Sequence, residues 1–453
     1  MPRQRAGRLR LLLADAGLGP QADWYLPRLC PDYDIRVVWL ASGDEGRDQA
    51  RATMFRAWLP DGAHLPVPGR PQMRELILAT AARWSPHGIA AVSGDQATAD
   101  VHAICHALGL PGNAPASLPA LYDKLAQREM LRAAGLPVPA FSAVDSHEAL
   151  VAALDYVGTP AVLKPVAGSG STATFRIDAA ADAARTWALA AAAARPGGEP
   201  AMPRFILEGL IAGQRRNADP RYGCQVSVES VVSGGEPVHL AITDKLPLLD
   251  FREVADIMPS TLPLAERDEL LAAATGALRA LRITNSATHT EFMLTADGPR
   301  LIEVNSRFGG GVVQLLHLAY GYDAVAAIAA VATGRAARAP GPPHRYAALL
   351  TPQAPTGSGR VTAAPSAEEL ERIPGAIAAV APVSPGDHPD PAAGTKGGAL
   401  VYLTAVADEP GPLIDLAALL ASDRYFRFET AGHPSDRSGS CRGPTRHAGH
   451  ART

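Results

Sequence analysis

The segment from His289 to Arg307 constrains the fold of this chain more than any other part of its sequence. Two runs of β-strand composition flank the dipeptide Asp297-Gly298, which favours a tight hairpin turn. A turn centred on Asp297 places Glu291 directly opposite Glu303. Because side chains alternate between the two faces of a strand, both carboxylates then lie on the same face. We therefore expect an antiparallel hairpin that brings two acidic side chains together.

The same register assigns the other hairpin residues to one of the two faces. His289 and Asn305 join the two glutamates. The opposite face is apolar enough to pack on a core and holds Thr290, Phe292, Leu294, Ile302 and Val304. Facing carboxylates repel each other unless a cation lies between them, and carboxylate and amide oxygens suit Mg²⁺. A single histidine among oxygens argues only weakly for zinc. The alternative is an ordinary solvated hairpin face.

A second cluster carries candidate phosphate ligands. The strand-like run from Pro160 to Pro165 contains Lys164, and Gly168 to Thr172 follow it before another strand, Ala173–Ile177. Glycines let consecutive backbone N–H groups turn toward an anion, and the hydroxyl groups add donors. The segment lacks the P-loop pattern and leads into a strand, so we expect a flap over phosphate. An ordinary glycine-serine turn is the alternative.

Three further features extend this cluster. Lys124 is a second candidate phosphate ligand. Arg307 lies just beyond the hairpin, where a guanidinium can neutralise charge on a transferred phosphoryl group. It leads into Gly309-Gly310-Gly311, which we expect to open a helix and leave free N–H groups for an anion. A tight turn at the helix entry is the alternative for these glycines.

Composition and charge narrow the class of function. The chain has 453 residues, 47% of them hydrophobic, which indicates several folded domains. Its net charge of −3 argues against the basic surface of a nucleic-acid or membrane binder. The four cysteines show no metal-binding spacing, as is typical of a reducing compartment. The apolar runs Leu11–Ala14 and Ala324–Ala332 are too short for a signal peptide or a membrane helix. We expect a cytoplasmic protein.

The first 120 residues alternate strand-like runs with amphipathic stretches, which predicts a Rossmann-like parallel sheet. Expected strands are Leu9–Ala14, Ile35–Leu40 and Ile89–Val92, and expected helices are Met73–Trp84 and Ala99–Leu108. Gly17-x-Gly19-x-x-Ala22 follows the first strand, as in dinucleotide-binding proteins. Pro20 stands where the helix of such a site should open, so we favour a plain glycine turn over a nicotinamide site.

The pattern changes near Tyr122 and predicts a multidomain chain of mixed α/β and α+β class. Residues 121–209 begin with a helix at Asp123–Ala134 and contain the glycine flap. Residues 210–335 contain further strands, the hairpin and a helix across Val312–Ala332, and residues 336–430 form a small C-terminal α+β domain. Residues 431–453 contain no Ile, Leu, Val or aromatic residue and are expected to form a disordered tail.

Taken in order, these motifs resemble the ATP-grasp ligase superfamily over roughly residues 8–425. The motifs are Asp123-Lys124 with Pro137-Val138-Pro139, Val162 to Pro165 with its Gly/Ser loop, Glu208, Ser227-Val228-Glu229, and the hairpin up to Arg307. Three segments are similar to the L-amino-acid ligases, which join amino acids into dipeptides: Ile242 to Lys245, Phe251 to Pro259, and Ala287 to Glu291. The resemblance implies a Rossmann-like domain (1–120), an ATP-grasp small subdomain with a phosphate lid (121–209) and a large subdomain with the metal site (210–335).

The resemblance also implies a role for each site residue. It assigns Glu291, Glu303 and Asn305 to two Mg²⁺ ions, with Mn²⁺ as an alternative ion. The implied ATP-binding residues are Lys124, Lys164, Gly168, Ser169, Gly170, Ser171, Thr172, Glu208, Leu210 and His289. The implied catalytic residues are Arg307, Lys164, Glu253 and Asp256. The implied substrate-binding residues are Glu253, Asp256, Arg307, Gly309 and Gly310.

The implied reaction is carboxylate–amine ligation. A substrate carboxylate attacks the γ-phosphorus of ATP to give an acyl phosphate and ADP, and an amine then displaces phosphate. Glu253 or Asp256 is expected to bind the ammonium group of the substrate or to remove its proton. The expected partners are small carboxylate and amine molecules, without nucleic acid or membrane, and a homodimer is left open. The alternatives are a carboxylase, or another enzyme that activates a non-amino-acid carboxylate, and a non-catalytic ATP-binding protein.

The chain departs from the superfamily pattern at three places. Gln225 stands where many members carry Glu, and Asp256 stands where amino-acid ligases often show His. The link from Ile211 to Gly223 is also longer than usual.

Overall fold

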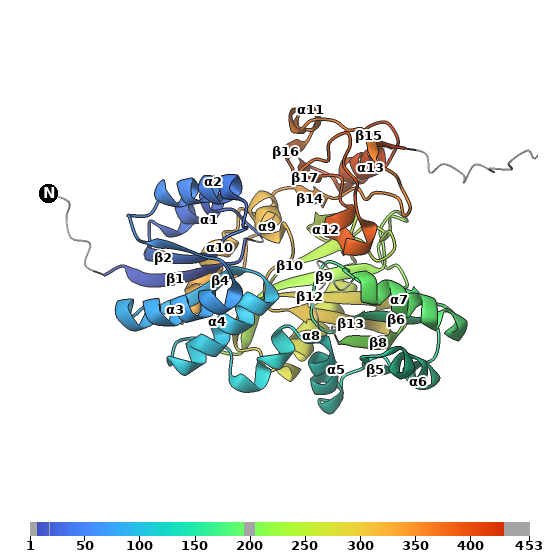
Figure 1. The fold of residues 1–453 in the computed structure, drawn as a ribbon, viewed down its shortest axis with the longest axis horizontal. Coiled ribbons are helices and arrows are strands. Elements are labelled where there is room, and N and C mark those ends of the chain that lie inside the picture. The colour runs from blue at the N-terminus through green and yellow to red at the C-terminus, as the bar shows by residue number, and fades with distance from the viewer. Residues whose placement is uncertain (1–6, 18, 194–203, 430–453) are drawn as a thin grey trace, which may run out of the picture.

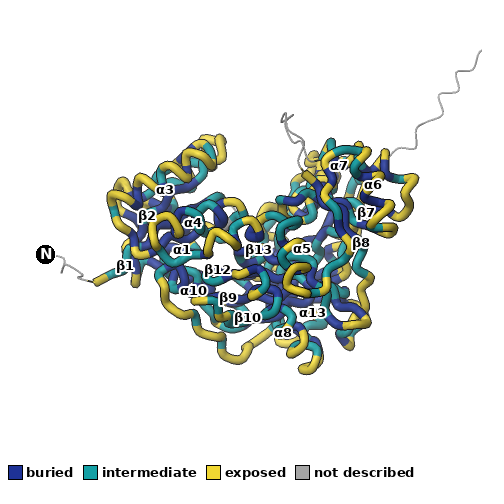
Figure 2. The backbone as a smooth tube through the Cα atoms, turned by 90° about the horizontal axis from the view of Figure 1, so that it is seen from below, coloured by how far each residue is buried: buried dark blue, intermediate teal, exposed yellow. Residues whose placement is uncertain are grey.

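The computed structural model describes residues 7–17, 19–193 and 204–429 of the chain. The segment 431–453, which we expected to be a disordered tail, lies outside the described residues. The chain forms a parallel sheet at one end, a small antiparallel sheet at the other end and a long antiparallel sheet that connects them (Figure 1). Buried backbone concentrates in the strands at the centre of the molecule, around β9 and β10 (Figure 2).

The N-terminal unit is the expected parallel sheet, with strand order β3-β2-β1-β4. Its strands are β1 Leu9–Asp15, β2 Tyr33–Leu40, β3 His64–Val67 and β4 Gly88–Ser93. Its helices are α1 Ala22–Leu29, α2 Glu45–Arg56, α3 Arg70–Trp84 and α4 Asp95–Ala107. Sequence analysis did not predict β3, α1 or α2. Helix α1 starts two residues after Pro20, at Ala22, so the proline delays the helix and does not prevent it.

The small sheet has the order β5-β8-β6-β7 and is antiparallel. Its strands are β5 Phe141–Val144, β6 Ala161–Pro165, β7 Phe175–Ile177 and β8 Phe205–Gly209. The helices of this part of the chain are α5 Lys124–Ala133, α6 His147–Val157 and α7 Ala183–Ala193. The expected helix at Asp123–Ala134 is α5, and the Asp123 side chain caps it by accepting from the N–H groups of Leu125 and Ala126. The glycine flap connects β6 to β7.

Eight described strands form the large antiparallel sheet, in the order β13-β12-β9-β10-β11-β14-β17-β16. They are β9 Gln225–Ser233, β10 Glu236–Lys245, β11 Ala255–Met258, β12 Asn285–Thr295, β13 Gly298–Asn305, β14 Tyr346–Leu350, β16 Ala376–Val380 and β17 Tyr402–Ala407. The other elements are α8 Leu264–Ala280, α11 Ala367–Glu371, α12 Gly394–Gly398, α13 Pro410–Leu420, β15 Val361–Ala363 and β18 Arg427–Phe428. The sheet therefore continues across residue 335, and strands of the 336–430 segment extend it. We propose that the domains end where the sequence analysis expected, at residues 120, 209, 335 and 430. The large sheet joins the domain 210–335 to the domain 336–430.

The β12–β13 hairpin brings Glu291 opposite Glu303 and His289 opposite Asn305, as the sequence predicted. The register shifts by one residue between Glu291 and Phe292, where a bulge on β13 contains the extra residue. The bulge moves Leu301 into the core, while the predicted core residue Ile302 lines the main cavity.

The predicted helix across Val312–Ala332 is two helices, α9 Val312–Tyr320 and α10 Ala324–Ala332, with a bend of 116° between them. Gly321 ends α9 with a φ of +64°, and the Asp323 side chain caps α10, so a glycine and an N-cap residue account for the break. Within the described residues no single helix is long and apolar enough to cross a membrane, and α9 and α10 meet that criterion only as a bent pair.

Helix α10 connects the N-terminal sheet to the large sheet. It contacts β4 on one side and β12 on the other, and its residues share a hydrophobic core with Leu11 and Leu13 of β1. The approach is close, because a Cβ atom on Gly88 would lie 2.0 Å from the carbonyl oxygen of Ala332. This packing fixes the N-terminal unit against the end of the hairpin, which positions the site described next.

Candidate active site

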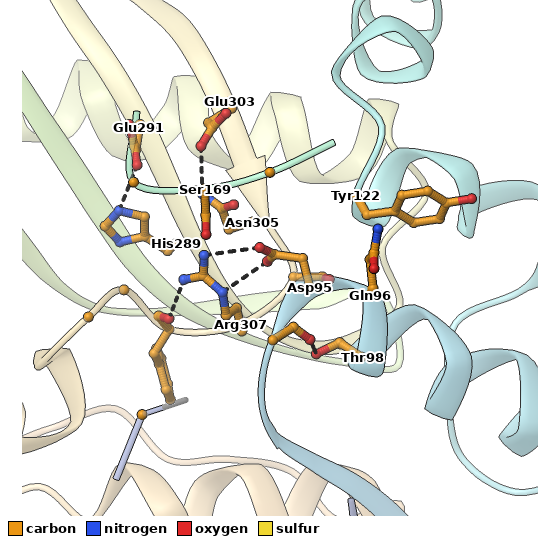
Figure 3. A pocket seen from close by; sticks show the side chains of 18 of the residues that line it. Asp95, Gln96, Thr98, Tyr122, Ser169, His289, Glu291, Glu303, Asn305 and Arg307 are labelled. Atoms are coloured by element: carbon orange, nitrogen blue, oxygen red, sulfur yellow. Dashed lines mark hydrogen bonds and ion pairs between the residues drawn. The ribbon is translucent and has the colours of Figure 1, made fainter. Parts of the chain in front are cut away.

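The N-terminal unit, the glycine flap, the hairpin and the C-terminal segment surround one cavity of about 760 Å³. Every residue that the sequence analysis named as catalytic, ATP-binding, metal-binding or substrate-binding lines it. Figure 3 shows Glu291, Glu303, Asn305 and Arg307 together in this cavity, with Asp95 of the N-terminal unit facing Arg307.

Internal cations compensate the two opposed carboxylates. Glu303 Oε2 lies 2.9 Å from Lys124 Nζ, and Asn305 Nδ2 donates to Glu303 Oε1 at 3.1 Å. Glu291 lies 3.1 Å from His289 Nε2, and Gln225 Nε2 donates to its other oxygen at 2.8 Å. The repulsion expected between the two acids is therefore offset by a lysine on one side and a histidine on the other.

The pKa values of the hairpin side chains follow from these contacts. Burial alone would raise the pKa of Glu303, but Lys124 and Lys164 more than offset it and lower this pKa to about 2. Burial alone would lower the pKa of His289, but Glu229 and Glu291 raise it to about 10. His289 Nδ1 lies 2.7 Å from the fully buried Glu229. At neutral pH Glu303 is thus a carboxylate and His289 an imidazolium.

The donor set suits a hard divalent cation. Within the described residues no group of three or more His, Cys, Asp or Glu side chains is arranged to hold a metal ion by itself. Glu291 and Glu303 nevertheless lie opposite each other on the cavity side of the hairpin, with Asn305 next to Glu303. Two carboxylates and an amide supply only part of an octahedral shell, which is how Mg²⁺ is bound when substrate phosphates complete it. These residues therefore fit Mg²⁺ that arrives with a nucleotide.

The candidate phosphate lysines extend into the cavity from two sides. Lys124 opens α5 and also donates to the carbonyl oxygen of Gly168 at 2.7 Å, so it connects the hairpin to the flap. Lys164 Nζ lies 2.8 Å from Glu208 Oε2. The buried Arg128 binds the other oxygen of Glu208 at 2.8 Å. The Glu208 carboxylate, one of the implied ATP-binding groups, thus holds Lys164 in position.

Arg307 is oriented by a residue that the sequence analysis did not identify. Its Nε lies 2.9 Å from Asp95 Oδ1, its Nη2 donates to Asp95 Oδ2 at 3.1 Å, and its Nη1 donates to the carbonyl oxygen of Phe308 at 2.9 Å (Figure 3). Asp95 is the first residue of α4. The expected helix after the three glycines is α9, and a Cβ on Gly309 would lie 2.7 Å from the His289 ring.

The glycine flap is docked against the loop between β10 and β11 and against the C-terminal segment. Ser171 Oγ donates to the carbonyl oxygen of Phe251 at 2.7 Å, and Thr172 Oγ1 donates to that of Ala393 at 3.1 Å. The N–H of Thr395 donates to Gly170 at 2.8 Å. Two hydroxyl groups that we expected to face phosphate therefore hold the flap closed over the cavity.

Glu253 and Asp256 both pair with the same lysine, Lys245. This lysine is 1% exposed and forms ion pairs with both acids, at 2.8 Å for Asp256 Oδ1. Burial would raise the pKa of Glu253, but Lys245 outweighs it and lowers this pKa. For Asp256 burial outweighs Lys245 and raises the pKa to about 6. The two acids thus differ in pKa, and together with Lys245 they carry a net negative charge once Asp256 is ionised.

This difference predicts a pH dependence. If Asp256 binds the ammonium group of a substrate, it must be ionised, so kcat/KM for the amine should fall about tenfold per pH unit below about 6. The Asp256→Asn variant should lack this inflection in a pH profile of kcat/KM, whereas the Asp268→Asn variant, at an acid of α8 outside the cavity, should keep it. An unchanged inflection in Asp256→Asn would contradict the assignment.

The residues that sequence analysis missed are partners of the residues it found. Asp95 and Arg128 carry no recognisable local motif, and each becomes significant only through a contact with a segment distant in sequence. Arg128 had one signal, because it lies one helical turn after Lys124 on α5. Glu229 and Lys245 belonged to segments that the resemblance covered, but their partners could not be inferred from the sequence.

The sequence is similar to one domain family and to several known proteins. The ATP-grasp domain family model matches residues 157–314. An alanine–anticapsin ligase of Bacillus subtilis (strain 168) is 30% identical over 227 residues, which cover 48% of this chain and 48% of that protein. The chain spans about half the length of the curated relatives it matches.

Two solved structures share the fold over most of their length. An L-amino acid ligase from Bacillus licheniformis superposes with a TM-score of 0.70 at 18% identity and covers 94% of this chain and 100% of its own. The biotin carboxylase domain of the Hydrogenobacter thermophilus 2-oxoglutarate carboxylase, solved with MgADP and bicarbonate, has a TM-score of 0.64 at 18% identity and covers 92% and 90%.

The fold is the one shared by these solved ATP-grasp structures, and the cavity lies where the candidate site residues meet. Residues 157–314 match the ATP-grasp domain family, and about half of the chain is similar in sequence to an amino-acid ligase, the alanine–anticapsin ligase.

Proposed function

We propose that the protein is an ATP-dependent carboxylate–amine ligase that releases ADP and phosphate, with an amino acid as one substrate. The observation that carries this proposal is that one cavity holds two charged regions. One contains the candidate phosphate ligands Lys124 and Lys164 with the opposed carboxylates, and the other contains the acid pair Glu253 and Asp256 with the buried Lys245. A ligase needs both regions, because it must activate a carboxylate and hold an amine beside it.

The first half-reaction requires positioning and charge neutralisation more than covalent chemistry. Lys124 and Lys164 lie where they can contact ATP phosphates, and Arg307 can neutralise charge that develops between the attacking carboxylate and the γ-phosphorus. When bound, Mg²⁺ held by Glu291, Glu303 and Asn305 would neutralise phosphate charge. The bond that forms joins a carboxylate oxygen to the γ-phosphorus, and ADP leaves.

The second half-reaction needs protection from water. An acyl phosphate hydrolyses, and the docked flap from Gly168 to Thr172 covers the cavity in which it would form. An amine held near Glu253 and Asp256 then attacks the carbonyl carbon, and phosphate leaves. The acid with the raised pKa, Asp256, is better suited than Glu253 to accept a proton from the attacking nitrogen.

Two similarities support an amino-acid substrate. The relative at 30% identity is an alanine–anticapsin ligase, and the fold neighbour with a TM-score of 0.70 is an L-amino acid ligase. The carboxylase domain shares the fold nearly as well, so the fold alone does not separate the two activities. The acid pair favours the ligase, because two carboxylates around one lysine suit an ammonium group better than bicarbonate.

The test is incubation of the protein with ATP, Mg²⁺ and pools of amino acids, followed by nucleotide analysis and product mass. Release of ADP only when two substrates are present, together with a product lighter by one water than their sum, supports ligation. Release of AMP, or ADP that depends on bicarbonate alone, overturns it. No turnover with any pool would also count against a ligase, and a rise in melting temperature with Mg·ATP would then leave a non-catalytic ATP-binding protein as the favoured function.

A further inference from the structure

Lys396 is a cavity cation that the reaction described above does not use. It belongs to α12, in the C-terminal segment, and it lines the cavity. Among the described residues, every other lysine or arginine that lines the cavity is paired with a carboxylate: Arg70 with Asp100, Lys124 with Glu303, Arg128 and Lys164 with Glu208, and Arg307 with Asp95. Within that same part of the chain Lys396 forms no ion pair and is exposed where it lines the cavity, so its charge is available to a ligand.

The residue that precedes Lys396 contacts the backbone of Glu253, one of the acid pair. The hydroxyl group of the preceding residue, Thr395, accepts a hydrogen bond from the N–H of Glu253 at 3.0 Å. Gln353 Nε2 joins the two segments, because it donates to the carbonyl oxygens of Glu253 at 2.9 Å and of Thr395 at 3.3 Å. The cations that suit ATP phosphates instead come from α5, β6 and the end of β13, where they have their own carboxylate partners.

The charged side chains in this part of the cavity suit a zwitterion, a molecule that carries one positive and one negative charge. With Asp256 ionised, Glu253 and Asp256 contribute two negative charges, and Lys245 and Lys396 contribute two positive charges. An amino acid brings one charge of each sign, so its ammonium can face the acid pair and its carboxylate can face Lys396. A substrate amine without a carboxylate would leave Lys396 without an anion.

We propose that Lys396 is a specificity-determining residue that binds the carboxylate of the amine-donating amino acid, the carboxylate that does not react and remains in the product. This inference rests on the ligase function proposed above and extends it, because it requires the amine donor to be an amino acid and not a simple amine. Lys396 is carried by the segment that docks the flap, since the N–H of Thr395 donates to Gly170. Two adjacent residues therefore serve the two tasks, since Thr395 holds the flap and Lys396 binds the carboxylate.

The test compares amino acids with their amides, which keep the ammonium group and lack the carboxylate. Two probe pairs, L-alanine with L-alaninamide and L-leucine with L-leucinamide, are titrated by calorimetry at about pH 7 in the presence of Mg²⁺ and a non-hydrolysable ATP analogue. In the wild-type protein the free amino acid of at least one pair should bind about tenfold or more tightly than its amide, because a charge-assisted contact is lost with the carboxylate. Lys396→Ala should abolish this preference, and Lys396→Arg should keep most of it.

Gly394→Ala is the matched control for the flap. Gly394 has a φ of +76°, and a Cβ there would lie 2.1 Å from the carbonyl oxygen of Gly170, so the variant should disturb flap docking without removing a charge. It should weaken both members of a probe pair alike. Equal binding of acid and amide by the wild-type protein, or a preference that survives Lys396→Ala, overturns the proposal. The proposal is also overturned if Lys396→Ala weakens binding of the ATP analogue alone, because Lys396 would then bind a phosphate of ATP and not the carboxylate of an amino acid. If the wild-type protein forms no ligated product from ATP and pairs of amino acids, the proposed ligase activity fails. The difference in binding between an amino acid and its amide tests the role of Lys396 separately.

Discussion

Glu303→Gln should lower ATP turnover by about 100-fold or more, because it removes one of the two opposed charges on the hairpin while keeping the shape of the side chain. Glu303 is the partner of Lys124 and has a pKa lowered to about 2, so it is ionised throughout the useful pH range. The variant should also need a higher Mg²⁺ concentration for half-maximal rate. Steady-state ADP release measured against Mg²⁺ concentration checks both effects.

A second acid on the same hairpin provides the control. The side chain of Asp297 at the turn is 83% exposed and contacts Arg300 only at 4.0 Å. Asp297→Asn removes the same chemical group at the exposed end of the hairpin and should leave turnover and the Mg²⁺ requirement unchanged. A Glu303→Gln variant with the wild-type Mg²⁺ dependence would reject the metal assignment, and equal losses in both variants would indicate damage to the hairpin instead.

The hairpin pairing was predictable because local chemistry determines it, although one detail of the prediction was wrong. The actual turn pairs Thr295 with Gly298, which by itself would shift the register of the two glutamates by one residue. The bulge on β13 adds the missing residue and restores the pair of Glu291 and Glu303. A bulge has no dependable sequence signal here, so Ile302 was assigned to the core by the same reasoning that placed the acids correctly.

Other parts of the fold depended on signals of different strength. The strand, glycine flap and strand of the small sheet were predicted because alternation and glycine content are local properties. Strand β5 and helix α6 were missed, and α9 and α10 were merged although Gly321 and Asp323 marked the break. The sharing of one sheet by the central and C-terminal segments depends on the pairing of β11 with β14, which no local pattern specifies.

The pairing of Arg307 with Asp95 leads to the second large expected effect. Arg307→Lys should lower kcat by roughly 100-fold or more, because a lysine cannot hold Asp95 with two donors and still present donors to the reacting groups. Three of the five guanidinium N–H groups are engaged by Asp95 and Phe308, which leaves two for substrate. Arg300→Lys, at a residue of β13 whose side chain is 34% exposed, should retain activity.

Asp95→Asn tests whether the N-terminal unit positions Arg307. Asp95 lies on α4 and is separated from Arg307 by 212 positions in the sequence, so the contact exists only because α10 fixes the N-terminal sheet against the hairpin. We expect Asp95→Asn to lower kcat by roughly tenfold to 100-fold, with little change in KM for ATP. Because Asp95 acts through Arg307, the double variant Asp95→Asn with Arg307→Lys should lose little more than Arg307→Lys alone. Fully multiplicative losses would mean that the two residues act independently and that α4 has a separate role in the cavity.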